Sequence, residues 1–168
     1  NMGRGKTVSD GIMAAKGALC GYLDVDCEVS PSYIPIFIKE LEAGSDIVVG
    51  KRYFEKSISS IWRVAASRVY SLIVKFFLKL PIDDTETGFK FFRRTKILPI
   101  LKKTRSTGWF WDTEICANSY YGGLAITEVP VIFKKRNDKK STVDLFGDSY
   151  SYLIEILKFS KRIKKSIK

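Results

Sequence analysis

Short apolar runs alternate with longer amphipathic stretches along the first half of the chain. Leu19–Leu23 and Ile47–Val49 have the length and composition of buried strands. Helical periodicity predicts a helix over Thr7–Ala18 and a second from Ser30 to about Ala43, where Ser is suited to the N-cap and Pro follows it. The succession of helix, strand, helix and strand predicts an α/β fold with a mostly parallel sheet flanked by helices.

The second half of the chain continues this alternation. Gly88–Arg93 and Ala125–Phe133 read as strands, and Asp112–Tyr121 reads as a helix. A last helix, Ser149–Ile167, places Leu153, Leu157 and Ser160 on one face and most of its lysines elsewhere. We therefore divide the chain into a folded domain over residues 1–147 and a basic amphipathic helix over residues 148–168.

The most apolar stretch, Ser59–Leu80, is predicted to form a long helix. Arg63, Arg68, Lys75 and Lys79 interrupt it, which argues against a membrane span. Two interpretations remain. The helix packs against the sheet, or its second half, Val69–Leu80, rests on a bilayer with its lysines at the surface.

Composition narrows the classes of function. With 168 residues, 45% of them hydrophobic, the chain can bury one real core, and the absence of His excludes His-based catalysis and His metal ligands. Three scattered cysteines show no zinc spacing and fit a reducing cytosolic setting. Residues 134–168 hold eleven Lys or Arg against four Asp or Glu, and so carry +7 of the net charge of +11. Such a segment attracts anions or an anionic membrane leaflet, or is simply a solvated helix face.

The sequence LDVDCEVSP ends the first predicted strand with two closely spaced carboxylates, Asp24 and Asp26. Mg²⁺ and Mn²⁺ prefer oxygen ligands, and Mg²⁺ typically binds one or two carboxylates together with substrate phosphates. Open α/β sheets also bind their ligands at the carboxyl ends of their strands. The alternative is an ordinary acidic turn.

Several further blocks follow in a fixed order. They are NMGRG at the start, DIVVGKR at Asp46–Arg52, DTETGFK at Asp84–Lys90, WDTE at Trp111–Glu114 and EVPV at Glu128–Val131. Taken together with LDVDCEVSP, these blocks resemble the C-terminal two-thirds of a family 2 glycosyltransferase of the GT-A fold. The resemblance is to the polyprenyl-phosphate branch, which includes the dolichyl-phosphate mannose and glucose synthases.

The resemblance implies an inverting enzyme that moves a mannose or glucose from a nucleoside-diphosphate sugar, GDP-mannose or UDP-glucose, to a dolichyl-type polyprenyl phosphate. It implies Mg²⁺ or Mn²⁺ as cofactor and work at the cytoplasmic face of a membrane, without nucleic acid. Family members begin with a nucleotide-binding strand–helix–strand segment that does not precede Asn1. We therefore expect a domain truncated at its N-terminus, whose free sheet edge could pair with a second copy of the chain.

The resemblance also assigns roles to residues. It implies that Asp24, Asp26 and Glu28 bind the metal and that Asp26 and Asp84 take part in catalysis. It implies that the acceptor phosphate is bound by Arg52, Arg63 and Ser67, and the donor diphosphate by Arg136, Lys140 and Ser141. Sugar binding is implied for Asp112 and Glu114. Two assignments carry alternatives. Asp83 adjoins Asp84, so the register there is open by one residue, and Asp112 and Glu114 could instead serve the N-terminus of their helix.

Three other functions compete with this interpretation. A catalytically silent remnant of such an enzyme could act as a scaffold at a membrane. A P-loop NTPase is suggested by Gly5-Lys6-Thr7, although the motif's earlier glycine would lie before Asn1. A nucleic-acid-binding module is suggested by the charge, but the basic residues do not alternate with aromatics on strands.

Overall fold

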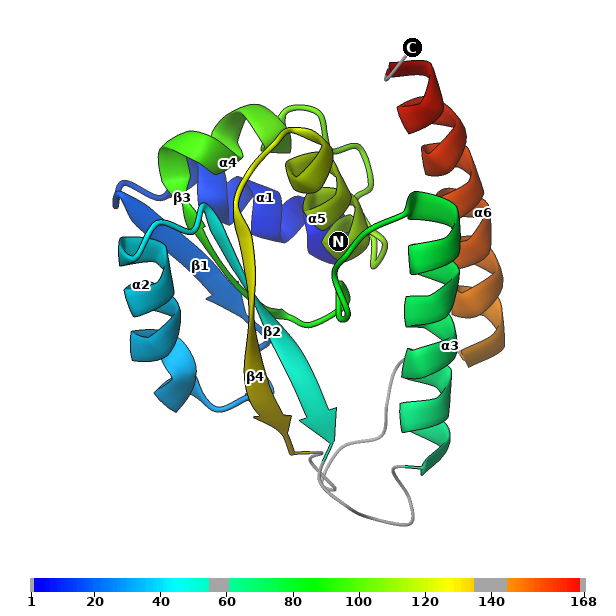
Figure 1. Cartoon of the computed structure of the whole chain (residues 1–168), viewed down its shortest axis with the longest axis horizontal. Helices are drawn as coiled ribbons and strands as arrows, with labels where there is room; N and C mark the ends of the chain where they lie inside the picture. The colour runs from blue at the N-terminus through cyan, green and yellow to red at the C-terminus, as the bar shows by residue number, and fades with distance from the viewer. Residues whose placement is uncertain (1, 55–60, 135–144, 167–168) are drawn as a thin grey trace.

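The computed structural model describes residues 2–54, 61–134 and 145–166, with side chains at all of these positions except 61–63, 66, 145–151 and 164–166. Its sheet has the strand order β1-β3-β2-β4. The strands are β1 (Leu19–Leu23), β2 (Ile47–Phe54), β3 (Phe89–Arg93) and β4 (Ile126–Phe133). β2 and β4 are parallel, whereas β3 runs antiparallel between β1 and β2. β1, β2 and β4 thus point the same way (Figure 1), and the predicted α/β class is confirmed.

The strand register brings three segments to one edge of the sheet. Leu23, the last residue of β1, pairs with Phe89, the first residue of β3. The turn after β1 therefore lies beside the segment that leads into β3. β2 runs toward the same edge and continues alongside β4 as far as the pair Phe54 and Phe133. This carboxyl edge is where an α/β sheet is expected to bind its ligands.

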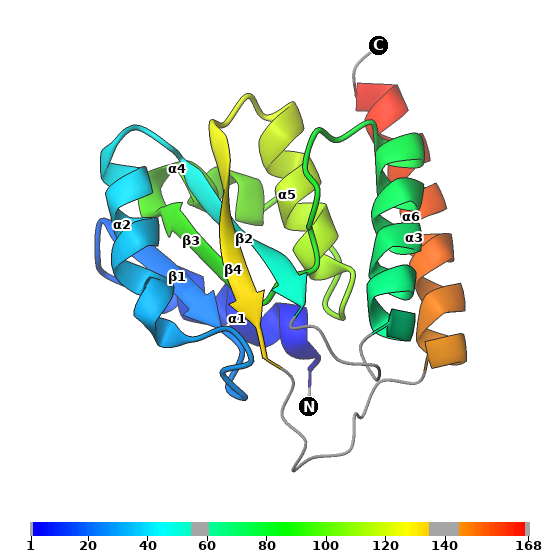
Figure 2. The same cartoon turned by 60° about the horizontal axis from the view of Figure 1, so that its bottom comes forward.

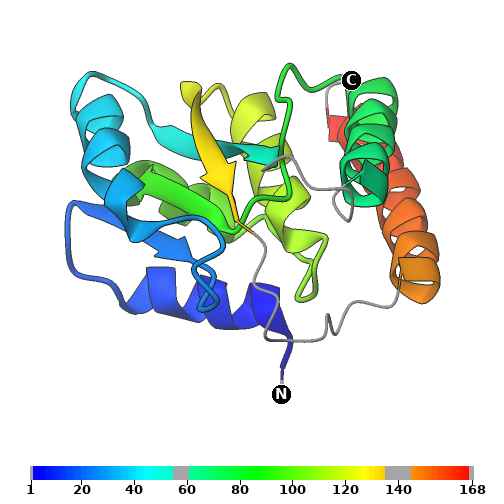
Figure 3. The same ribbon diagram turned by 90° about the horizontal axis from the view of Figure 1, so that it is seen from below.

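Helices cover both faces of the sheet. The short helix η1 (Pro31–Tyr33) and α2 (Ile34–Glu42) lie on one face, and α1 (Arg4–Ala14), α4 (Arg94–Leu101) and α5 (Trp111–Tyr121) lie on the other (Figures 2 and 3). Phe37 and Leu41 of α2 pack on Val48 and Phe89. The opposite core contains Ile12, Ile97, Trp111 and Ile115 around Ile47, Val49 and Phe92. The first four residues of β2 and of β3 are buried between these layers, which explains the apolar run that opens β2.

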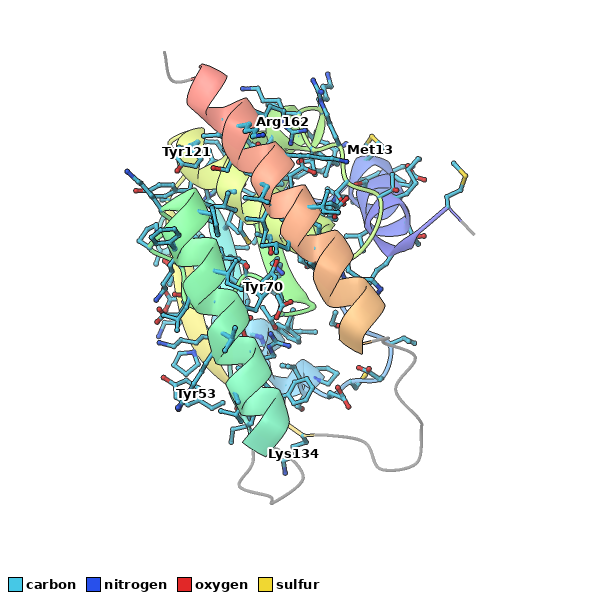
Figure 4. The ribbon with its side chains drawn as sticks, turned by 90° about the vertical axis from the view of Figure 1, so that its right-hand side faces the viewer. Met13, Tyr53, Tyr70, Tyr121, Lys134 and Arg162 are labelled. Carbon is cyan, nitrogen blue, oxygen red and sulfur yellow. The ribbon has the colours of Figure 1, made fainter. Side chains whose placement is uncertain are left out.

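The long helix α3 (Ile61–Leu78) lies beside α6 (Leu145–Ser166) at one side of the molecule (Figures 1 and 4). Its buried residues Val74 and Leu78 contact a cluster formed by Phe110 and Ala117 near α5 and by Ile156 and Phe159 of α6. The interpretation that this helix packs against the sheet is therefore wrong, because its buried face contacts α6 and residues in and near α5 instead. The reason is that α5 already covers this part of the sheet.

The outer face of α3 is apolar and exposed. Val69, Leu72 and Phe76 are 55%, 66% and 77% exposed. Their spacing of three and four residues places them on one stripe of the helix. In the described part of the chain, no helix is long and apolar enough to cross a bilayer.

Helix boundaries and faces differ in part from the predictions. α1 begins at Arg4 and α6 at Leu145, each earlier than expected, and α4 was not predicted. On α6 the buried residues are Ile156, Phe159 and Ser160, while Leu153 and Leu157 are both 38% exposed. The predicted apolar face of this helix is therefore rotated, because α3 and α5 select which residues are covered.

Candidate functional site

The carboxyl edge of the sheet encloses an open recess. Asp24, Asp26 and Glu28 from the turn after β1 line it together with Arg52 of β2 and Glu86. Thr87, Gly88, Phe89, Val29 and Phe133 complete it. The recess thus brings together the three metal ligands that the sequence predicted and Arg52, one of the predicted acceptor-phosphate residues.

Asp24 is held by the backbone of the segment that enters β3. Its amide N–H donates to the Gly88 carbonyl at 2.9 Å. A Cβ added at Gly88 would lie 1.8 Å from Asp24 Oδ2, so only glycine leaves room for this carboxylate. The role of Gly88 is therefore to allow this close approach.

Arg4 ties the acidic turn to the core. Its guanidinium donates to Asp24 Oδ1 from Nη2 at 2.7 Å and from Nε at 3.2 Å, and it also donates to Asp112 Oδ2. The same guanidinium lies 5.3 Å from the centre of the Trp109 ring. Burial lowers the pKa of Arg4, but the surrounding anionic groups outweigh this effect and the net shift is upward. Arg4 therefore stays charged and shares one positive charge between two carboxylates.

Asp112 lies at the centre of a buried network. Besides Arg4, it accepts hydrogen bonds at Oδ1 from the Tyr22 hydroxyl and from Lys90 Nζ, the latter at 2.7 Å. Lys90 is fully buried and also donates to the Thr87 carbonyl. Because Asp112 is only 3% exposed and has protein partners on both oxygens, the geometry gives it a structural role and gives no support to sugar binding.

Glu114 is likewise internal. One oxygen accepts from the backbone N–H groups of Arg105 and Ser106 at 3.0 and 2.6 Å, and the other pairs with Arg162 of α6. Glu114 is 1% exposed. Glu114 thus joins α6 to the segment before α5. It does not cap its own helix, which has no side-chain cap, and its burial gives no support to sugar recognition.

Asp24, Asp26 and Glu28 are the candidate ligands for a divalent cation. Carboxylate oxygens suit Mg²⁺ or Mn²⁺, and all three side chains line the recess. Within the described residues, however, no group of three such side chains lies close enough to hold a metal ion as it stands. A site completed by substrate phosphates needs only one or two carboxylates, so the donor set fits such a cation.

Arg52 and Asp84 form a two-pronged ion pair. Arg52 Nε donates to Asp84 Oδ2 at 2.6 Å and Nη2 donates to Oδ1 at 2.9 Å, while the Arg52 backbone N–H reaches the same carboxylate at 3.1 Å. Burial raises the pKa of Asp84, but Arg52 outweighs this effect and the net shift is downward. Asp84 is therefore an ionised partner that orients Arg52.

The segment that carries Asp84 is fastened from both sides. The Glu128 carboxylate of β4 accepts from the backbone N–H of Asp83 at 3.0 Å and of Asp84 at 2.9 Å. The Asp83 side chain pairs instead with Lys51, at 2.5 Å, and with Lys75 of α3. Asp84, and not Asp83, thus faces Arg52.

A second, smaller recess lies between α3 and this segment. Ser67, Tyr70, Ser71 and Val74 of α3 line it together with Ile82, Asp83, Asp84, Thr85 and Glu86. The Tyr70 side chain lies between α3 and α6 (Figure 4), where its ring contacts Tyr152. Ser67 therefore adjoins Asp84 and Glu86 but lines a different recess from Arg52. The side chain of Arg63 lies outside the described part of the structure, as do Arg136, Lys140 and Ser141.

Two residues of the site were not singled out from the sequence. Arg4 was noted only as part of the opening block, and Glu86 only as part of DTETGFK. The sequence held a signal for Glu86, because a third acidic residue follows Asp83 and Asp84 closely. It held no signal for the pairing of Arg4 with Asp24 and Asp112, which are 20 and 108 residues away.

Comparison with known proteins identifies the family. Residues 1–99 match the profile of the family described as "Glycosyl transferase family 2". The chain belongs to this family.

Individual relatives agree with this assignment. The family 2 chain is 28% identical over 160 residues to glycosyltransferase AglD of Haloferax volcanii, covering 94% of this chain and 25% of that protein. It is 25% identical over 118 residues to polyprenol monophosphomannose synthase of Mycolicibacterium smegmatis, covering 68% of this chain and 44% of that protein. The chain thus spans less than half the length of these two curated relatives.

Solved structures support the fold. Glucosyl-3-phosphoglycerate synthase from Mycobacterium tuberculosis, in complex with Mn²⁺, UDP and glucosyl-3-phosphoglycerate, superposes with a TM-score of 0.68 at 16% identity. The match covers 95% of this chain and 55% of that one. The GT-A-like fold implied by the sequence resemblance is confirmed.

Proposed function

We propose that the family 2 chain is part of a glycosyltransferase that moves a hexose from a nucleoside-diphosphate sugar to a polyprenyl phosphate. The observation that carries this proposal is the recess that brings carboxylates and a guanidinium together. Asp24, Asp26 and Glu28 supply oxygen ligands, and Arg52 supplies a cationic group. Such a recess suits a donor diphosphate with its cation and an anionic acceptor.

The residues divide the work as follows. One or two of the carboxylates of Asp24, Asp26 and Glu28 would hold Mg²⁺ or Mn²⁺ together with the diphosphate, and the ion would offset the negative charge that develops on the departing group. Arg52, oriented by Asp84, positions the acceptor phosphate. Because a phosphate oxygen is already ionised near neutral pH, it attacks the anomeric carbon without a strong base, and Asp84 need not remove a proton.

The exposed stripe of α3 favours a lipid as the carrier of that phosphate. Val69, Leu72 and Phe76 are exposed on the helix that also lines the second recess through Ser67 and Tyr70. Lys75 and Lys79 lie on the same helix and its end, and the net charge is +11. An apolar stripe near basic residues suits an anionic membrane surface, for which we propose the cytoplasmic face.

The proposal is tested with the product of the complete reading frame. We expect hexose transfer from GDP-mannose or UDP-glucose to a polyprenyl phosphate, lost on chelation and restored by Mg²⁺ or Mn²⁺. Asp26→Ala should lower kcat/KM by roughly 100-fold or more. Unchanged activity of Asp26→Ala would remove Asp26 from the site. Failure of the wild-type protein with both donors would favour the catalytically silent scaffold.

A further inference from the structure

Glu86 occupies a position that the proposed division of work does not use. In the described part of the chain it is the residue that lines both recesses, the one with Arg52 and the acidic turn and the one against α3. Its backbone N–H donates to Asp84 Oδ1 at 3.1 Å, so its main chain is fixed beside the ion pair. Its side chain is 26% exposed and can reach solvent.

The Arg52 guanidinium faces two carboxylates and treats them unequally. Asp84 takes the two short bonds from Nε and Nη2, at 2.6 and 2.9 Å. Glu86 Oε2 receives only a long contact from Nη2, at 3.4 Å. Charge-assisted bonds of this type are normally 2.7–2.9 Å long. The Asp84 pair is therefore well formed, and the Glu86 contact is the one that a competing anion displaces most easily.

The aromatic surroundings keep Arg52 in place while its partner changes. The guanidinium carbon lies 5.7 Å from the ring centre of Phe54 and 5.8 Å from that of Phe133. In the described structure, no hydrogen bond uses Arg52 Nη1. Arg52 thus retains a donor for an incoming phosphate oxygen without leaving Asp84.

The local charge balance points the same way. Burial raises the pKa of the Glu86 carboxyl to about 7, an effect that Arg52 opposes and that Asp84 and Asp112 reinforce. The hydroxyls of Tyr70 and Tyr152 also lie near it, and Asp24, Asp26 and Glu28 line the same recess. One guanidinium does not fully compensate two carboxylates at this depth, and Glu86 is the less well compensated of the two.

We propose that Glu86 acts as a gate on Arg52. Glu86 contacts the Arg52 guanidinium when no acceptor is bound, and the acceptor phosphate displaces it. Asp84 keeps Arg52 oriented throughout. This inference rests on the proposed function and adds a specificity device to it. A strongly anionic acceptor group displaces Glu86, whereas a neutral hydroxyl group does not. Glu86 is thus a positioning residue that acts through Arg52.

The test measures binding without requiring sugar transfer. Inorganic phosphate and a water-soluble short-chain isoprenyl monophosphate are titrated into the chain by calorimetry or NMR at pH 8, where Glu86 is largely ionised. We expect Glu86→Gln to tighten the binding of both by roughly tenfold and Arg52→Lys to weaken it. Glu86→Ala serves as the second variant if the glutamine variant does not fold.

Asp83→Asn is the matched control. It removes one negative charge from the same segment, but Asp83 pairs with Lys51 and Lys75 and not with Arg52. A gain in Glu86→Gln that Asp83→Asn does not share supports the gate. Equal gains, or no gain in Glu86→Gln, overturn it. If both probes respond to Glu86 but the wild-type protein transfers no sugar to polyprenyl phosphate, the gate stands and the proposed acceptor is wrong.

Discussion

Gly88 and Asp24 show how a single residue can decide the shape of the site. Because a Cβ at Gly88 would overlap Asp24 Oδ2, the Gly88→Ala variant must move either that carboxylate or the start of β3. We expect a loss of roughly 1–3 kcal/mol in the free energy of unfolding and binding of Mn²⁺ with a nucleoside diphosphate weakened by about tenfold or more. Denaturant unfolding and metal titration measure the two effects.

Gly108→Ala is the control for that variant. A Cβ at Gly108 would meet no atom within 4 Å, so it tests the loss of glycine without a clash. Equal behaviour of the two variants would mean that Asp24 does not depend on Gly88.

Glu86 also gives the folded chain a pH dependence. Its carboxyl pKa, ordinarily 4.5, is raised by burial to about 7 in the folded state. The folded state therefore binds this proton more tightly than the unfolded state does. The resulting stabilisation is complete below about pH 4.5 and is lost as pH rises through about 7.

The corresponding measurement is chemical denaturation between about pH 5 and pH 8. Over this range the wild-type free energy of unfolding should fall by on the order of 1–2 kcal/mol more than that of Glu86→Gln. Asp84 contributes little in this range, because its pKa is lowered and its stabilisation is lost only in acid. Parallel pH profiles for the two proteins would contradict the assignment.

Sequence reasoning located the acidic turn and Arg52 but not their partners. Asp24, Asp26 and Glu28 could be anticipated because carboxylates directly after a strand share an edge of the sheet. The burial of Asp112 could not, because it depends on Arg4 and Lys90, which are 108 and 22 residues away along the chain. Local patterns do not encode which distant cation compensates a given carboxylate.

At the level of elements, the strands were easier to predict than the partners of the helices. β1 matches its predicted bounds, since a short apolar run between polar segments has few alternatives. α4 was missed; it is short and contains Pro99. The amphipathic pattern of α6 showed that one face is covered, but only the presence of α3 determines that Ile156 and Phe159 form that face.

The outer face of α3 carries the prediction at this scale. Leu72→Ser combined with Phe76→Ser should weaken binding to vesicles of anionic phospholipid by roughly tenfold or more, because about two apolar side chains no longer enter the bilayer. Sedimentation with vesicles measures the effect. The fold should be retained, since Leu72 and Phe76 are exposed.

Ile36→Ser is the comparison variant for α3. Ile36 is 46% exposed on α2, across the sheet from α3, and its loss should leave vesicle binding unchanged. Equal weakening by both sets of changes, or by neither, would argue against α3 as the membrane-facing helix.

At the scale of the whole molecule, α6 is attached near α5 by apolar packing and by an ion pair that has one buried partner. Arg162, labelled on α6 in Figure 4, pairs with Glu114, whose side chain is 1% exposed. Arg162→Met should cost roughly 3 kcal/mol or more, because it leaves a buried carboxylate without its cation. Lys161→Met, at an exposed neighbouring position, should change stability by less than about 0.5 kcal/mol. Thermal unfolding of the two variants separates these outcomes.

The contact between Arg4 and the Trp109 ring gives the molecule a built-in optical signal. Arg4 holds Asp24 with the same guanidinium that lies over the indole. A divalent cation that takes Asp24 from Arg4 changes the charge above that ring, and indole emission is sensitive to such a change. If the acidic turn binds a metal ion as proposed, the intrinsic fluorescence of the chain should report it, so that binding could be followed without a label, a substrate or a chemical reaction.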